Sequence, residues 1–192
     1  MALDQTTIVD LTRTLEPSDY LRCTPLAHAA TPLGMGYGET RFASPTEAFK
    51  LLYIAEDLPT SITEAIVRDR FEGNVEREMV DSDFTDWGVC EVNASAPLRL
   101  LDLRHDGCFK LGISTDIIGA KAQDEAREFS EELHATTDLD GIVYLSRLCR
   151  RECIAIYERA VEDKLTATPV VPLVEVADLI PALETLKITL ID

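Results

Sequence analysis

The sequence predicts one domain of the α+β class, with a mostly antiparallel sheet, over residues 1–192. Strand-like segments outnumber helical ones, and several of them follow one another directly, which favours antiparallel pairing over a doubly wound parallel sheet. No internal repeat and no linker-like stretch divides the chain. A length of 192 residues, with 46% apolar and 28% charged residues, is sufficient for one full hydrophobic core.

The first half of the chain contains two expected strands and one expected helix. Residues 21–24 form a short strand-like piece before a long loop, rich in Thr, Pro and Gly, that runs to Pro45. The apolar run 49–55 is expected to be a strand. Asp57 then announces a helix, whose apolar positions recur as far as Phe71. Loops such as the one before Pro45 often carry binding residues.

The second half alternates apolar strand patterns with two amphipathic helices. The short apolar and β-branched runs predict strands at 88–92, 98–104, 142–146, 151–159 and 167–173. Helical spacing predicts helices at 121–133 and 178–186. Residues 146–151 are then the loop of a hairpin between two of these strands.

The charge balance excludes some partners. With 18 basic against 35 acidic residues, the formal net charge is -17, so the chain repels nucleic acid and anionic membrane surfaces. A phosphate-bearing ligand must therefore be held by local positive charge. Arg22, Arg41 and the cluster Arg147, Arg150 and Arg151 are the candidates for that charge.

Other features of the sequence argue against a secreted, membrane-bound or metal-dependent protein. No apolar stretch approaches the ~20 residues that span a bilayer, and the N-terminal residues lack a signal-peptide pattern, so we expect a cytoplasmic protein. The 3 histidines have no metal-ligand spacing, and we expect no metal. The 5 cysteines lack CxxC spacing and are expected to be free thiols: Cys23, Cys90, Cys108, Cys149 and Cys153.

An ordered series of residues resembles the RES domain family, which is the toxin half of bacterial toxin–antitoxin pairs and is named for Arg, Glu and Ser. The resemblance covers roughly residues 19–160 and depends on the spacing of several short segments. One departure is the loop segment Glu39–Ala43, ETRFA, where the family more often has Gly-Arg-Trp-Asn. The matching positions are Arg22 in YLRC, the pair Arg41-Phe42, Tyr53 in LLYIAE, Glu64 in the next helix, the strand LLDLR, Gln123, and Ser146 in DGIVYLSR.

The resemblance implies a fold similar to ADP-ribosyltransferases, with a mostly antiparallel split sheet and flanking helices. It also implies that the chain consumes NAD by breaking the bond between nicotinamide and ribose. The ADP-ribose then passes to water, to inorganic phosphate or to a protein, and we favour a small acceptor. The expected partner is an antitoxin protein.

The chemistry of NAD cleavage requires few groups. Nicotinamide is already a cationic leaving group, so the enzyme must mainly stabilise the oxocarbenium-like ribose, for which Glu64 is the candidate carboxylate. Tyr53 is expected to stack on the nicotinamide ring, a contact worth about 0.5–2 kcal/mol. Arg41 and Arg22 offer planar forks for the pyrophosphate. Ser146 is expected to bond the ribose or the amide. Gln123, at the start of its helix, joins the binding residues through the resemblance.

Each of these residues also has a purely structural interpretation. Ser61-x-x-Glu64 matches a capping box, in which Glu64 bonds only the backbone at the start of the helix. Tyr53 alone is more often a residue of a strand core, arginines of an acidic protein are often surface ion-pair partners, and Ser146 alone is typical of a turn. Two other functions therefore remain open: a non-catalytic protein-binding module of the same fold, and a hydrolase that uses Ser146 or Cys149 as nucleophile.

Overall fold

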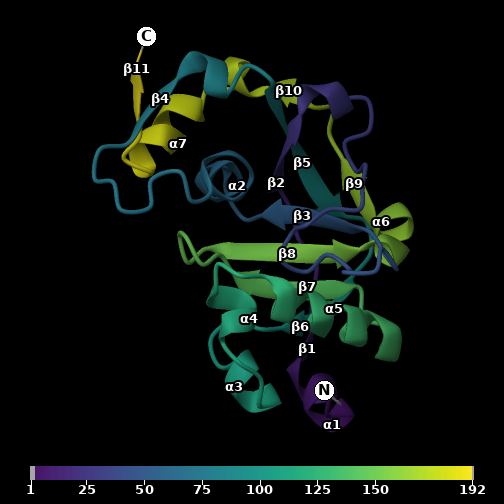
Figure 1. Ribbon diagram of the computed structural model, residues 1–192. Helices are drawn as coiled ribbons and strands as arrows, with labels where there is room; N and C mark the ends of the chain where they lie inside the picture. The colour runs from purple at the N-terminus through teal and green to yellow at the C-terminus, as the bar shows by residue number, and fades with distance from the viewer. Residues whose placement is uncertain (1–2, 192) are drawn as a thin grey trace.

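The computed structural model describes residues 3–191 and has a mixed α+β architecture built around one curled sheet of nine strands (Figure 1). The strand order is β1-β6-β7-β8-β3-β2-β5-β10, and β9 also pairs with β5. The neighbouring strands of this sheet run antiparallel except β6 and β7. The strands are β1 (Thr12–Leu15), β2 (Tyr20–Pro25), β3 (Leu51–Ala55), β5 (Trp87–Ala94), β6 (Leu98–Asp102), β7 (Gly141–Leu145), β8 (Glu152–Tyr157), β9 (Leu165–Ala167) and β10 (Val171–Pro172).

The sheet is split between β2 and β3. These two strands share one register pair, Leu21 with Ala55, whereas β3 and β8 pair over five residues and β2 and β5 over six. In Figure 1, β2 and β5 accordingly run steeply across the direction of β3, β8 and β7. Because β2 and β3 diverge after a single register pair, their side chains face an open wedge between the two strands. The candidate site lies in this wedge.

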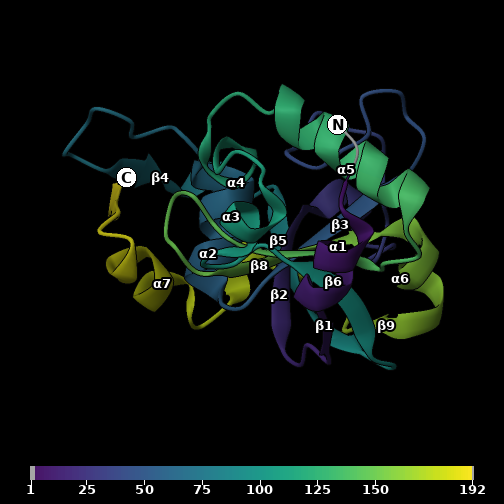
Figure 2. The same ribbon diagram turned by 90° about the horizontal axis from the view of Figure 1, so that it is seen from below.

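Helices cover the sheet on several sides (Figure 2). Helices α1, α3, α4 and α5 share one core cluster with β3, β6, β7 and β8, while α6 packs on the opposite face. A third cluster joins α2 and α7 to β5. A separate parallel pair consists of β4 (Glu78–Val80) and β11 (Thr189–Ile191). The helices are α1 (Gln5–Leu11), α2 (Leu58–Ile62), α3 (Gly107–Leu111), α4 (Asp116–Gly119), α5 (Asp124–Thr136), α6 (Glu158–Lys164) and α7 (Leu179–Thr185), with short 3₁₀ segments η1 (Leu26–His28), η3 (Asp81–Asp83) and η4 (Leu173–Glu175).

Helix α2 brings one wall of the wedge into position. It begins at an N-cap, Asp57, whose carboxylate accepts a hydrogen bond from the Thr60 backbone N–H at 2.8 Å. It continues as a π-helical segment, η2 (Thr63–Val67), a widening that is frequent at functional sites. The segment ends at Arg68, whose φ of 48° and ψ of -125° lie outside the helical region.

The α+β class and the mostly antiparallel sheet are confirmed, and the expected strands and helices are present with shifted ends. The expected helix to Phe71 was too long, because the backbone turns sharply at Arg68. The expected strand 151–159 was also too long, since α6 begins at Glu158. The single strand expected at 167–173 is instead two short strands, β9 and β10, which both pair with β5.

Candidate active site

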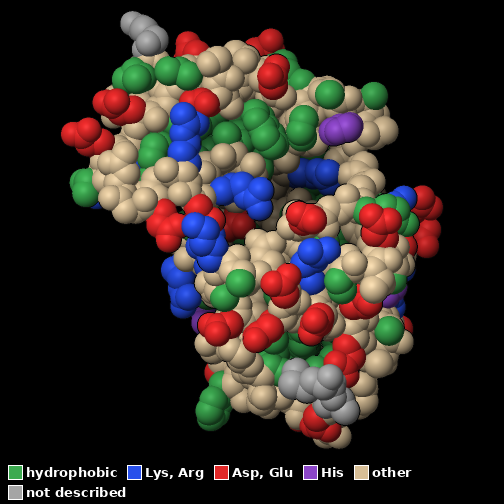
Figure 3. All heavy atoms as spheres, in the orientation of Figure 1, with side chains coloured by type: hydrophobic (Ala, Val, Ile, Leu, Met, Phe, Trp, Pro, Cys, Tyr) green, Lys and Arg blue, Asp and Glu red, His purple; other side chains and the backbone are tan. Residues whose placement is uncertain are grey.

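A cavity of about 310 Å³ lies where the two halves of the sheet part. Its walls come from β2 and β3, from the helix α2 with η2, and from the loop between β7 and β8. In the space-filling view, Lys and Arg side chains gather around a hollow in the middle of this face (Figure 3). The cavity has the size and location typical of a small-molecule site.

Glu64 is held in this cavity by a buried hydroxyl group. Its Oε1 accepts a hydrogen bond from Ser146 Oγ, and Ser146 itself is fully buried directly after β7. The same Oγ accepts the backbone N–H groups of Leu148 at 3.1 Å and Cys149 at 3.3 Å. The hydroxyl is thus oriented by its own loop and can donate only toward the carboxylate, which fixes the position of Glu64.

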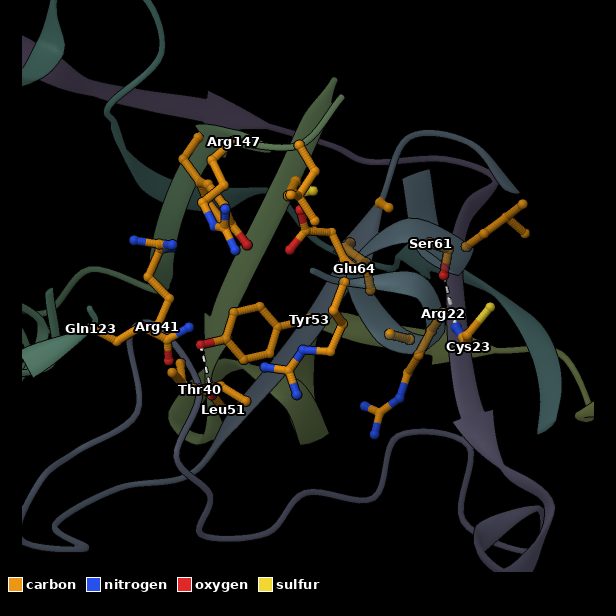
Figure 4. A pocket seen from close by; sticks show the side chains of 18 of the residues that line it. Arg22, Cys23, Thr40, Arg41, Leu51, Tyr53, Ser61, Glu64, Gln123 and Arg147 are labelled. Atoms are coloured by element: carbon orange, nitrogen blue, oxygen red, sulfur yellow. Dashed lines mark hydrogen bonds between the residues drawn. The ribbon is translucent and has the colours of Figure 1, made fainter. Parts of the chain in front are cut away.

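The capping-box interpretation of Glu64 is wrong. The N-cap of the helix is Asp57, and Ser61 lies inside the helix with its Oγ accepting the Cys23 backbone N–H at 2.8 Å. Ser61 therefore joins the helix to β2 across the wedge, a contact drawn in Figure 4. Glu64 is free of any capping role, and its carboxylate lines the cavity.

Tyr53 presents its ring to the cavity and anchors its hydroxyl in the wall. The hydroxyl accepts hydrogen bonds from the Phe42 backbone N–H at 3.1 Å and from Thr40 Oγ1 at 3.0 Å, the second of which is drawn in Figure 4. Burial raises the pKa of Tyr53 to about 12, so the phenol stays neutral over the whole physiological range. The bonded hydroxyl matches the structural interpretation of this residue, while the exposed ring face is compatible with stacking.

Arg41 is tied to the helical side of the cleft. Its Nη1 donates to the Ile117 carbonyl at 3.2 Å and its Nη2 to the Ala120 carbonyl at 2.7 Å, at the end of α4. Burial lowers the pKa of the guanidinium group, which nevertheless stays charged. These bonds tie the middle of the long loop from residues 29 to 50 to α4, and Arg41 still forms part of the cavity wall.

Arg22 has an incomplete set of partners. Its Nη2 donates to the Gly34 carbonyl at 2.7 Å, whereas its Nη1 is buried without a hydrogen-bond partner among the described residues. Burial lowers the pKa of this guanidinium group. A buried donor without a partner costs about 1–3 kcal/mol, more for a charged group, and this one belongs to a residue that lines the cavity.

Arg147 and Gln123 complete the predicted set around the Tyr53 ring (Figure 4). Gln123 is the N-cap residue of α5. Arg147 Nη2 forms an ion pair with Asp69, and hydrogen bonding from Arg147 holds the pKa of the Asp69 carboxyl below its ordinary value. Ser146 lies behind Glu64 and outside the cavity lining, so its placement favours an orienting role over the direct sugar contact that we expected.

Two of the expected cations lie elsewhere, and the cavity contains one that sequence reasoning missed. Arg150 and Arg151 do not line the cavity, and Arg151 instead lies 3.8 Å from the carboxylates of Glu56 and Asp57. Arg68, directly after η2, does line it. Arg68 was missed because the helix was expected to continue past this position. The signal that could have indicated it was a positive charge directly after an apolar helical run.

The described residues contain no group of three or more His, Cys, Asp and Glu side chains that could hold a metal ion. The 5 cysteines are free thiols, as expected. No helix in the described part of the chain is long and apolar enough to cross a membrane.

The structure thus combines a split sheet, flanking helices and a cleft lined by arginine and glutamate side chains. A model of the RES domain matches residues 10–176, and the chain therefore belongs to the RES domain family, as the spacing of its motifs predicted. The match extends over both halves of the sheet, so the cleft between them is part of the family domain.

The chain is similar to proteins that are named as toxins or belong to a toxin–antitoxin complex. It is 34% identical over 88 residues to "Probable toxin y4kH" of Sinorhizobium fredii, an alignment that covers 45% of this chain and 68% of that protein. Its fold matches a chain in the crystal structure of the MbcT–MbcA toxin–antitoxin complex of M. tuberculosis, with a TM-score of 0.63. That match covers 88% of this chain and 92% of the other at 15% identity, and so supports the fold.

Proposed function

We propose that this chain is a toxin that cleaves the nicotinamide–ribose bond of NAD and is neutralised by an antitoxin. The observation that carries the proposal is the arrangement of Glu64: a carboxylate oriented by a buried serine hydroxyl, in a cavity that also contains an aromatic ring and a guanidinium group with an unpartnered nitrogen. Each group corresponds to one requirement of NAD cleavage.

The proposed mechanism begins with departure of nicotinamide. The electron pair of the C–N bond moves to the nicotinamide nitrogen, which leaves as a neutral molecule, and positive charge develops on the ribose. The Glu64 carboxylate stabilises that charge, because Ser146 holds it in place before the substrate binds. The neutral Tyr53 ring stacks on the cationic nicotinamide in the ground state.

The cations of the cavity are proposed to bind the phosphates. Arg22 Nη1 gains a partner when a ligand oxygen reaches it, which offsets the cost of leaving it buried and unpaired. Arg41 is held rigidly by two backbone carbonyls and supplies positive charge without having to reorder its side chain. Gln123 supplies an amide at the rim of the same cavity.

The acceptor of ADP-ribose is proposed to be small, either water or inorganic phosphate. Of the arginine cluster in the β7–β8 loop, Arg147 lines the cavity and is the residue that could attract a phosphate acceptor. Transfer to water releases ADP-ribose, and transfer to phosphate releases its phosphorylated form, so mass analysis of the product separates the two.

A serine hydrolase has less support. A nucleophilic hydroxyl must reach the substrate, whereas Ser146 is fully buried and does not line the cavity. A non-catalytic module would have no need of a desolvated, half-paired arginine in its cleft.

The antitoxin partner is proposed from the two relatives, one named as a probable toxin and the other part of a toxin–antitoxin complex. An antitoxin that covers the cleft between the two halves of the sheet would block substrate entry without changing the fold.

Glu64→Gln tests the catalytic proposal. Glutamine keeps the shape and can still accept the Ser146 hydrogen bond, but it loses the negative charge. We expect nicotinamide release from NAD to fall by about 10²-fold or more while the melting temperature stays nearly unchanged, because Asp57 caps the helix. Glu128→Gln, a change on the exposed side of α5, is the matched control. Undiminished release by Glu64→Gln would rule out this mechanism.

A further inference from the structure

A second cavity of about 520 Å³ adjoins the first. It is bounded by the end of η2, the turn that follows it, the loop after β7 and the C-terminal end of α7. The two cavities share a wall made of Arg68, Asp69, Arg147 and Leu148. The two cavities therefore meet at these four side chains.

The second cavity carries excess positive charge in a chain of formal net charge -17. Its two acidic residues are already paired, Asp69 with Arg147 and Glu72 with Lys121. Arg68, Arg77 and Lys187 also line it, and none of these three forms an ion pair with a carboxylate among the described residues. Uncompensated cations around a concave surface favour an anionic ligand.

The rest of the lining is mostly apolar. Val67, Phe71, Leu148 and Ile188 supply aliphatic and aromatic surface between the charged groups, and Thr63 and Thr185 supply hydroxyl groups. A predominantly apolar lining with a few polar groups is typical of small-molecule sites, and here the cations add a preference for phosphate. This combination fits a nucleoside monophosphate, whose flat base needs apolar surface and whose phosphate needs cations.

The first cavity alone is small for a dinucleotide. Its volume of about 310 Å³ is at the lower end of the range of about 300–1,000 Å³ seen for small-molecule sites. Tyr53 and Glu64 assign that space to the nicotinamide and its ribose. The other half of the molecule must then lie beyond the first cavity.

We propose that the second cavity binds the adenosine monophosphate half of NAD, an inference that rests on the proposed function. The phosphate on the nicotinamide side contacts Arg22, and the phosphate on the adenosine side contacts Arg68 in the shared wall. The adenine base lies on the apolar surface around Phe71, and Arg77 and Lys187 add positive charge at the rim.

The backbone at Arg68 is consistent with a binding role. A φ of 48° with a ψ of -125° is a conformation that glycine adopts readily and that costs other residues of order 1–3 kcal/mol. Such strain persists where the surrounding structure imposes it, and it occurs often at ligand sites. Here it places a guanidinium group without a hydrogen-bond or ion-pair partner among the described residues on the wall between the two cavities.

The test uses two variants that remove charge from the second cavity. Lys187 has a φ of 56°, and asparagine tolerates positive φ well, so Lys187→Asn should leave the fold intact. Arg77→Gln removes a second charge, together with the Arg77 Nη1 hydrogen bond to the Leu186 carbonyl at 2.9 Å. Lys110→Gln, on the distant helix α3, is the matched control. Adenosine monophosphate and nicotinamide mononucleotide are each titrated by calorimetry, and KM is measured for NAD.

We expect Lys187→Asn and Arg77→Gln each to weaken adenosine monophosphate binding and to raise KM for NAD by about tenfold. Their binding of nicotinamide mononucleotide should be unchanged, and Lys110→Gln should match the native chain in every measurement. Equal binding of adenosine monophosphate by all variants, or no binding by the native chain, would overturn the inference. If the native chain releases no nicotinamide from NAD, the proposed function fails, while the calorimetric comparison still reports on the second cavity.

Discussion

Two arginine side chains in this molecule, Arg104 and Arg22, differ in how completely they are paired. Arg104, after β6, uses its whole fork: Nε and Nη2 donate to Asp102 at 2.9 and 2.7 Å, and Nη1 donates to Glu152. Tyr20 on β2 donates to the other oxygen of Glu152, so the network joins the two halves of the sheet. Arg22, on the same strand as Tyr20, has one carbonyl partner and one buried nitrogen without any.

The difference separates a structural arginine from a binding arginine. A buried charge is tolerated when hydrogen bonds and opposite charges compensate for its lost hydration. Arg104 meets that condition inside the protein, and its pKa is raised, with hydrogen bonding to Asp102 as the main cause. Arg22 meets it only in part, and desolvation lowers its pKa. The missing compensation is available to a ligand, which is the basis for placing substrate phosphate there.

The largest expected effect on stability comes from breaking the complete network. Arg104→Met leaves the carboxylates of Asp102 and Glu152 close together without their cation. Because these side chains are only 15% exposed, we expect a loss of about 2 kcal/mol, below the range for fully buried pairs. This corresponds to a melting temperature lower by about 4–8 °C, measured by calorimetry. An unchanged melting temperature would mean that this network does not stabilise the packing of the two halves of the sheet.

Arg22→Met is expected to have the opposite profile. The methionine fills the same space without a desolvated charge, so stability should change by less than about 1 kcal/mol despite the lost bond to Gly34. KM for NAD should rise by about tenfold through loss of a charge-assisted hydrogen bond to phosphate. A large loss of stability with an unaltered KM would place Arg22 with Arg104 among the structural arginines.

The fold was predictable where the signal was local. The apolar periodicity of α5, with Ala126, Phe129 and Leu133 on its buried face, predicted a helix at 121–133, and each end of the observed helix lies three residues later. By contrast, β4 and β11 are three-residue strands that pair in parallel between residues 78–80 and 189–191. Neither segment has enough alternation to be recognised alone, because each is stabilised mainly by the other. Helix α6 was missed because its first two residues, Glu158 and Arg159, fall within the strand expected at 151–159, and only Ala160 and Val161 of this short helix are buried.

The site was predictable as a set of residues and unpredictable as a set of contacts. The spacing of Arg22, Tyr53 and Glu64 brought them to one cavity, as expected. Local spacing suggested that Ser61 would cap the helix, whereas the cap is Asp57 and Ser61 bonds β2, a choice that depends on tertiary packing. The burial of Ser146 and the incomplete pairing of Arg22 depend on groups more than ten residues away in sequence, so no local pattern could reveal them.

The smallest expected effect is a difference in how the contributions of Arg104 and Arg22 to folding stability depend on pH. Burial alone would raise the pKa of Asp102, but hydrogen bonds from the Arg104 side chain and backbone outweigh it, and the net pKa lies below the ordinary 3.8. A carboxyl with a depressed folded-state pKa stabilises the fold above its unfolded value, and that contribution is lost as pH falls through the folded value. The stability gap between the native chain and Arg104→Met should therefore be constant from pH 7 to pH 5 and narrow below about pH 4. Denaturant unfolding at each pH measures the gap, and Arg22→Met, which has no carboxylate partner to lose, should show no such narrowing. A gap that stays constant down to pH 3 would show that Asp102 does not owe its low pKa to Arg104.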